Sequence, residues 1–175
     1  MTQFIMQPGD YYAPFHEGYV QLMKDQDVVD ILHRQRKSFA ELISSIPDGK
    51  ADSAYGPGKW TVKQVIQHVI DTERIFAFRL LAMSRGEQQP IPGFEQDDYV
   101  KAVDVSGRGL QDQRKEFETV RDATLTLVHS ISPEEAVRHG IVSGYPLTAR
   151  ALPFIMAGHV EHHIRVLKEK YGLNG

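Results

Sequence analysis

The stretch ALPFIMAGHVEHHIRVLKEKYG, residues 151–172, decides the fold. Its apolar residues recur at the three-to-four-residue spacing of one helix face, and Gly172 is a typical helix stop. We therefore predict a helix over about residues 148–171. Pro153 is awkward inside it. Either the helix proper begins near Leu152 with Pro153 at its first position, or an earlier first turn bends at Pro153.

Two histidines of this stretch, His159 and His163, stand four residues apart. At about 100° per residue, both fall near the middle of the apolar stripe of the helix. That stripe consists of Leu152, Met156, Val166 and Leu167. Buried imidazoles need partners for their nitrogens, and one divalent metal would satisfy both rings. The pair also fits two core histidines that hydrogen-bond to carbonyls or carboxylates, so the spacing alone leaves both interpretations open.

The remaining histidines are placed around this pair. His162 falls at the edge of the stripe, where we expect it to line a pocket rim or to support a ligand. Four others lie outside any ligand spacing and are interpreted as ordinary surface or core residues: His16, His33, His129 and His139. His68 lies off the centre of its own helix's apolar stripe, so it gains significance only when paired with His159 and His163.

Three further segments have helical periodicity, over about residues 27–46, 61–84 and 110–130. Asp27 is a plausible N-cap of the first, and Thr61 with Gln64 fits a capping box at the start of the second. Strand signals are weak, with no clear alternating run around a two-residue turn. The prediction is an all-α, four-helix bundle in one domain spanning residues 1–175.

The segment between the second and third helices, Gly86–Gly109, is long and rich in proline and glycine. Fully extended it reaches on the order of 80 Å, whereas a 20-residue helix is about 30 Å long. It can therefore cross the whole bundle, which permits parallel second and third helices and an up-down-down-up topology. A partly disordered surface loop is the alternative.

Composition excludes several classes of function. The chain contains no cysteine and eight histidines, so disulfides, thiolate metal sites and a cysteine nucleophile are excluded. A net charge of −3 gives no electrostatic case for nucleic acid or for an anionic membrane surface. No run approaches the roughly 18 apolar residues of a membrane span, and the N-terminus does not resemble a signal peptide. By default we expect a cytoplasmic protein.

Two acidic residues of the second helix, Asp71 and Glu73, are candidate general bases. Asp71 points away from the His68 side and is expected to face solvent. Glu73 falls on the apolar stripe, where a carboxylate needs a partner. We predict that it pairs with Arg121 of the third helix and is structural in preference to catalytic.

Three pieces of the chain together resemble the DinB superfamily of DinB/YfiT-like helical bundles. They are YGPGKWTVKQVIQHVIDTE, GFEQDDYV in the long loop, and ALPFIMAGHVEHHIRVLKEKYG. The resemblance implies an up-down-down-up bundle, often a homodimer. It also implies a divalent metal held by one histidine of the second helix and two of the fourth, which correspond to His68, His159 and His163.

The resemblance leaves the reaction open, because the family's chemistry is diverse. The leading hypothesis is a transferase that uses an external low-molecular-weight thiol, such as bacillithiol or mycothiol, on a small-molecule electrophile. A metal-dependent hydrolase that activates water is the first alternative. A non-enzymatic metal-binding stress protein is the second. Zinc or nickel is the expected metal, since imidazole suits both, and no catalytic side chain is assigned.

Overall fold

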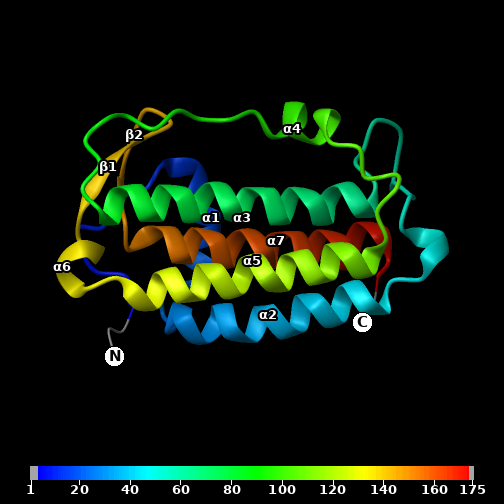
Figure 1. Cartoon of the computed structure of the whole chain (residues 1–175), viewed down its shortest axis with the longest axis horizontal. Coiled ribbons are helices and arrows are strands. Elements are labelled where there is room, and N and C mark those ends of the chain that lie inside the picture. Colours follow the sequence, from blue (N-terminus) through cyan, green and yellow to red (C-terminus); the bar gives the residue numbers. More distant parts are fainter. Residues whose placement is uncertain (1–3, 174–175) are drawn as a thin grey trace.

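The computed structural model describes residues 4–173. Four long helices form the bundle: α2 (Val28–Ser45), α3 (Val62–Ser84), α5 (Leu110–Ser130) and α7 (Ala151–Tyr171). The shorter elements are α1 (Glu17–Met23), α4 (Gln96–Ala102), α6 (Pro133–Ala136), β1 (His139–Val142), β2 (Tyr145–Thr148) and two 3₁₀ turns, η1 (Pro14–His16) and η2 (Asp48–Lys50). The predicted four-helix architecture is confirmed (Figure 1).

Local signals fix the helix ends. The Asp27 carboxylate accepts a hydrogen bond from the Val29 amide at 2.9 Å and begins α2. Thr61 and Gln64 form the predicted capping box of α3. Helix α7 begins at Ala151, so Pro153 is its third residue, within the first turn, where its missing N–H breaks no helical hydrogen bond. Gly172, with a φ of 66°, ends α7 in the left-handed region.

The crossover of residues 86–109 determines the topology. It runs along the outside of α3 for nearly the whole length of the bundle and includes α4 (Figure 1). Helices α3 and α5 consequently point the same way, and α2 and α7 point the opposite way (Figure 1). This is the predicted up-down-down-up arrangement. Among residues 4–173, no helix is both long and apolar enough to cross a membrane.

A small β-hairpin is present beside the predicted all-α bundle. Strands β1 and β2 pair antiparallel, from His139 opposite Thr148 to Val142 opposite Tyr145. Ser143 and Gly144 form the turn with φ values of 54° and 84°, as the right-handed twist of a two-residue hairpin requires. The strands are only four residues each and lack clean alternation, so the sequence signal was too weak.

The core contains two apolar clusters, one in each half of the bundle. The first includes Phe76 and Ala157, and the second includes Val69 and Val160. His159 therefore lies in the sequence between a residue of one cluster and a residue of the other. The predicted Glu73–Arg121 pair is confirmed within the core.

Candidate metal centre

Three histidine side chains converge between α3 and α7. His68 Nε2 lies 3.0 Å from His159 Nε2, and His163 Nε2 lies 3.2 Å from the same atom. His68 comes from α3, while His159 and His163 lie one turn apart on α7. All three side chains are buried, with 4%, 5% and 8% exposure respectively. The donor atoms all lie within 4.8 Å of one another.

This geometry fits a divalent ion. Two imidazole nitrogens bound to one tetrahedral zinc are about 3.3 Å apart, given Zn–N distances of about 2.0–2.1 Å. The observed separations of 3.0 and 3.2 Å are close to that value. Three neutral imidazoles also leave at least one position open for water or substrate, as in catalytic zinc sites.

Hydrogen bonds among the three rings do not give every imidazole nitrogen a partner. His68 and His163 both direct Nε2 at the same nitrogen of His159. If both donate to it, the Nδ1 of His163 is left as a buried acceptor, and no described residue offers it a partner. With Nε2 on a metal, each Nδ1 instead carries a proton. That of His68 lies 3.4 Å from the Thr72 hydroxyl oxygen, whereas that of His163 still has no partner among the described residues.

Electrostatics keep the three rings neutral. Burial lowers the pKa of His68 to about 4 and that of His163 to about 3. It also lowers the pKa of His159 well below its ordinary value, with the neighbouring histidines adding to the effect. Each ring therefore has a nitrogen lone pair available at neutral pH, which is the form that binds metals.

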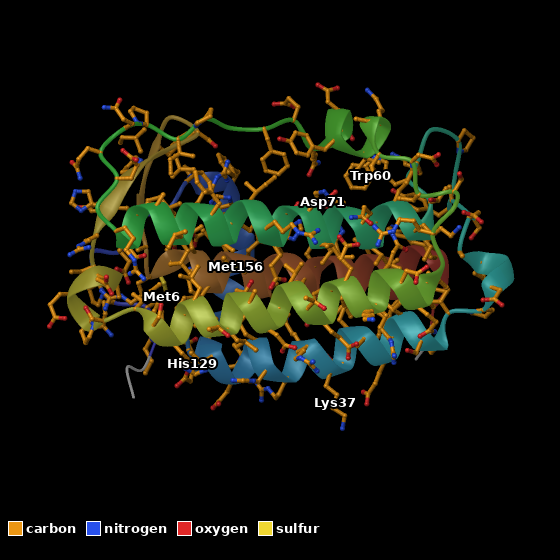
Figure 2. The ribbon with its side chains drawn as sticks, viewed as in Figure 1. Met6, Lys37, Trp60, Asp71, His129 and Met156 are labelled. Carbon is orange, nitrogen blue, oxygen red and sulfur yellow. The ribbon has the colours of Figure 1, made fainter. Side chains whose placement is uncertain are left out.

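Two cavities flank the histidine cluster. One, here called the Arg79 cavity, has a volume of about 410 Å³ and is lined by His16, His68, Thr72, Phe76, Arg79 and His159, among others. The other, the Trp60 cavity, has a volume of about 390 Å³ and is lined by Trp60, Asp97, His162, His163, Val166 and Tyr171, among others. Gln96 of α4 lines both. Figure 2 shows Trp60 near the start of α3, on the side covered by the crossover.

The structure thus brings together His68, His159 and His163, the residues expected to bind metal. His162 is exposed, lines the Trp60 cavity and lies with its ring centroid 5.0 Å from that of His163. Asp71 is more buried than expected. It accepts a hydrogen bond from Gln67 at 2.9 Å, and burial raises the pKa of its carboxyl group.

Two residues of the Arg79 cavity were not singled out from the sequence. His16, expected to be an ordinary histidine, is buried there, and its Nδ1 has no hydrogen-bond partner among residues 4–173. Burial lowers its pKa to about 4. Arg79 lies on the His68 side of α3, a position that helical periodicity gives. Its surroundings are formed by the crossover and the hairpin, and helical periodicity does not predict where these segments pack.

The fold and the site together define a helical-bundle metal-binding protein. The family model described as the DinB superfamily matches residues 31–167. The chain therefore belongs to the DinB superfamily.

Known relatives agree with this assignment at low sequence identity. The "Putative metal-dependent hydrolase OB0413" of Oceanobacillus iheyensis is 21% identical over 131 residues, which are 73% of this chain and 74% of that protein. The structure of YfiT from Bacillus subtilis, described as a probable metal-dependent hydrolase with an unusual four-helix bundle topology, superimposes with a TM-score of 0.70. Its sequence identity is 16%, over 97% of this chain and 95% of YfiT.

A mycothiol-dependent maleylpyruvate isomerase shares the fold as well. Its structure superimposes with a TM-score of 0.65 at 13% identity, over 87% of this chain and 62% of the isomerase. At these identities the similarity to solved structures establishes the fold alone.

Proposed function

We propose that the protein is a metal-dependent transferase that joins a low-molecular-weight thiol to a small electrophile. In this proposal His68, His159 and His163 hold a divalent ion, with zinc and nickel as the first candidates. The convergence of their Nε2 atoms, their burial and their neutral state support the ligand set. The chain has no cysteine, so a thiol nucleophile would have to come from a small molecule.

The bound metal would supply Lewis acidity, which lowers the pKa of a thiol and yields the thiolate at neutral pH. The sulfur then forms a bond to an electrophilic carbon, and the leaving group departs with the bonding electron pair. The thiol proton passes to solvent. Three imidazole ligands would leave at least one coordination position for the thiol, and Phe76 and Trp60 line the cavities in which the two organic molecules would pack.

The observation that carries this proposal is the presence of two cavities, one on each side of the histidine cluster. His68 and His159 line the Arg79 cavity, and His163 lines the Trp60 cavity. Each has a volume within the range of small-molecule sites, about 300–1,000 Å³. A reaction between two organic molecules needs room for both beside one reactive centre, and these two cavities would supply it. A hydrolase could use the same two spaces for the two parts of its substrate, so assays must separate the two reactions.

Hydrolysis is the second candidate, because OB0413 and YfiT are both described as metal-dependent hydrolases. The same open site would lower the pKa of a bound water. The two reactions share the metal, so the ligand set and the reaction need separate tests.

Metal content tests the ligand set. We expect tag-free protein incubated with zinc or nickel and then dialysed to retain about one ion per chain, and His159→Ala to retain little. His129→Ala is a matched control, since His129 is exposed and lies near the opposite end of the bundle from Trp60 (Figure 2). Equal metal content in wild type and His159→Ala would refute the ligand assignment.

A substrate panel tests the reaction. Metal-loaded protein is assayed with bacillithiol, mycothiol, glutathione or cysteine plus a simple alkyl halide, and separately with esters and amides. The proposal expects metal-dependent consumption of thiol and electrophile together. Ester or amide cleavage without thiol would favour the hydrolase, and retained metal with no turnover in either panel would favour a binding protein.

A further inference from the structure

The cationic side chain of Arg79 is buried, and no residue in the described part of the chain is its anionic partner. Its residue exposure is 3%, and no carboxylate among residues 4–173 lies within ion-pair distance of its guanidinium. Glu95 lines the same cavity but is exposed and forms no ion pair with it. Burial lowers the pKa of Arg79, and no neighbouring carboxylate opposes that effect. Buried charges normally have a counter-charge, so this one is an exception.

The neutral contacts of Arg79 use only part of its hydrogen-bonding capacity. One terminal nitrogen, Nη2, donates to the Pro92 carbonyl oxygen at 3.2 Å and lies 3.5 Å from the Ser143 hydroxyl oxygen. The Nε is buried and has no acceptor among the described residues. These contacts tie the crossover and the hairpin to α3, but they do not neutralise the charge.

The surroundings of the guanidinium favour an organic anion. Its central carbon lies 5.7 Å from the ring centroids of both Phe76 and Phe94. Aromatic rings interact with the face of a guanidinium, which leaves its N–H edge for hydrogen bonds. A single guanidinium can bind one carboxylate. The two phenylalanine rings can pack against an apolar group that the carboxylate carries. His16 also lines this cavity, with its ring 6.1 Å from the Phe76 ring between centroids.

We infer that Arg79 binds the carboxylate of a small organic acid in the cavity that His68 and His159 also line. The molecule would extend from the guanidinium toward the histidine cluster, with its apolar part between the phenylalanines. The identification of this acid as a reactant rests on the proposed function, whereas the anion site itself does not. Arg79 would thus select molecules that carry a carboxylate, and it would not take part in the chemical step.

A matched pair of probes tests the anion site without any turnover. Benzoate and benzamide have nearly the same shape and differ in charge. Their affinities are measured by calorimetry on the full chain in the presence of a chelator, because a metal would itself attract carboxylates. We expect the dissociation constant of wild type for benzoate to be at least about tenfold lower than that for benzamide, because hydrogen bonds between charged groups are the stronger ones.

Variants of Arg79 identify the source of that preference. Arg79→Met should abolish the preference for benzoate, and Arg79→Lys should weaken it several-fold, because an ammonium lacks the planar fork. Circular dichroism and metal content show whether each variant is folded. If Arg79→Met does not fold, the test relies on the more conservative Arg79→Lys. Equal binding of the two probes to wild type, or unchanged benzoate binding to the variants, would overturn the inference.

Two further comparisons show which reactant bears the carboxylate. Cysteine against cysteamine tests the thiol, and iodoacetate against iodoacetamide tests the electrophile, each as the rate with metal-loaded protein above the uncatalysed rate. A carboxylate preference that is weaker in Arg79→Lys and absent in Arg79→Met assigns the anion to that reactant. If no thiol reacts at all, the proposed transferase fails, while the benzoate result still decides the anion site.

Discussion

Gly158 of α7 lies directly against the backbone of Tyr19 in α1, so that a Cβ added at Gly158 would lie only 2.6 Å from the Tyr19 Cα. The absence of a side chain at Gly158 therefore allows α1 to dock on α7 beside the histidine cluster. The Tyr19 ring consequently lies 5.7 Å from the His159 ring, between centroids, and His16 enters the Arg79 cavity.

Gly158→Ala should displace α1. We expect a loss of about 1–3 kcal/mol in the free energy of unfolding, the usual cost of overpacking, as measured by denaturant titration. Gly18→Ala is the matched control, since a Cβ at Gly18 meets nothing within 4 Å. Alanine there should be neutral or stabilising, because it favours the helix. Equal stability of Gly158→Ala and wild type would show that α1 is not held by this contact.

Removal of one partner of the buried pair of Glu73 and Arg121 should strongly destabilise the protein. The two side chains are 1% and 0% exposed, and the carboxylate accepts hydrogen bonds of 2.6 and 2.8 Å from the guanidinium. Arg121→Met leaves an unpaired buried carboxylate and should cost about 3–5 kcal/mol.

A neighbouring pair provides the control for that experiment. Asp122 lies next to Arg121 on α5 and pairs with Arg36 at the surface, at 2.5 Å. Asp122→Asn should cost about 0–1 kcal/mol, because solvent screens exposed pairs. Comparable losses in the two variants would contradict a structural role for the buried pair.

The metal-free protein should lose stability as the pH falls from about 6.5 to about 4. In this window the unfolded chain binds protons at its histidines, with pKa values near 6.5. The folded chain does not, because burial lowers the pKa of His16 to about 4. His16 alone would contribute at most about 3 kcal/mol to the loss.

The comparison of wild type with His16→Gln isolates that contribution. Denaturant titrations with chelator at pH 7.5 and pH 4.5 should show a smaller loss of stability in the variant. Parallel losses in the two proteins would mean that His16 titrates normally in the folded state.

Metal affinity should change little between pH 7.5 and pH 5.5. Exposed histidines become protonated below about pH 6.5 and then lose metal affinity. Burial instead lowers the pKa of His68 to about 4 and of His163 to about 3, so protons do not compete in this range. Calorimetric titration of tag-free protein with zinc checks this, and a tenfold weakening for each pH unit below 6.5 would contradict it.

Local signals in the sequence predicted the helices well. The start of α3 follows from a capping box and the end of α7 from a glycine stop. The Glu73–Arg121 pair follows from the need of a buried carboxylate for a partner. Each of these features depends on residues within one helix or on one chemical requirement, so a single sequence can reveal them.

Site residues whose positions depend on the packing of separate segments could not be predicted from local signals. His68 gained its role from family resemblance, because its helical position alone is ambiguous. The positions of His16 and Arg79 depend on where α1, the crossover and the hairpin pack. Those segments are short or lack periodicity, so nothing local in the sequence specifies their final contacts.

The crossover and the histidine cluster can be altered by substitution independently of each other. The three histidines belong to α3 and α7, which pack directly on each other, whereas Gln96 of the crossover lines both cavities. The donor atoms and part of the cavity walls thus belong to separate stretches of chain. Substitutions within residues 86–109 would therefore alter which molecules fit the cavities without altering the three imidazoles.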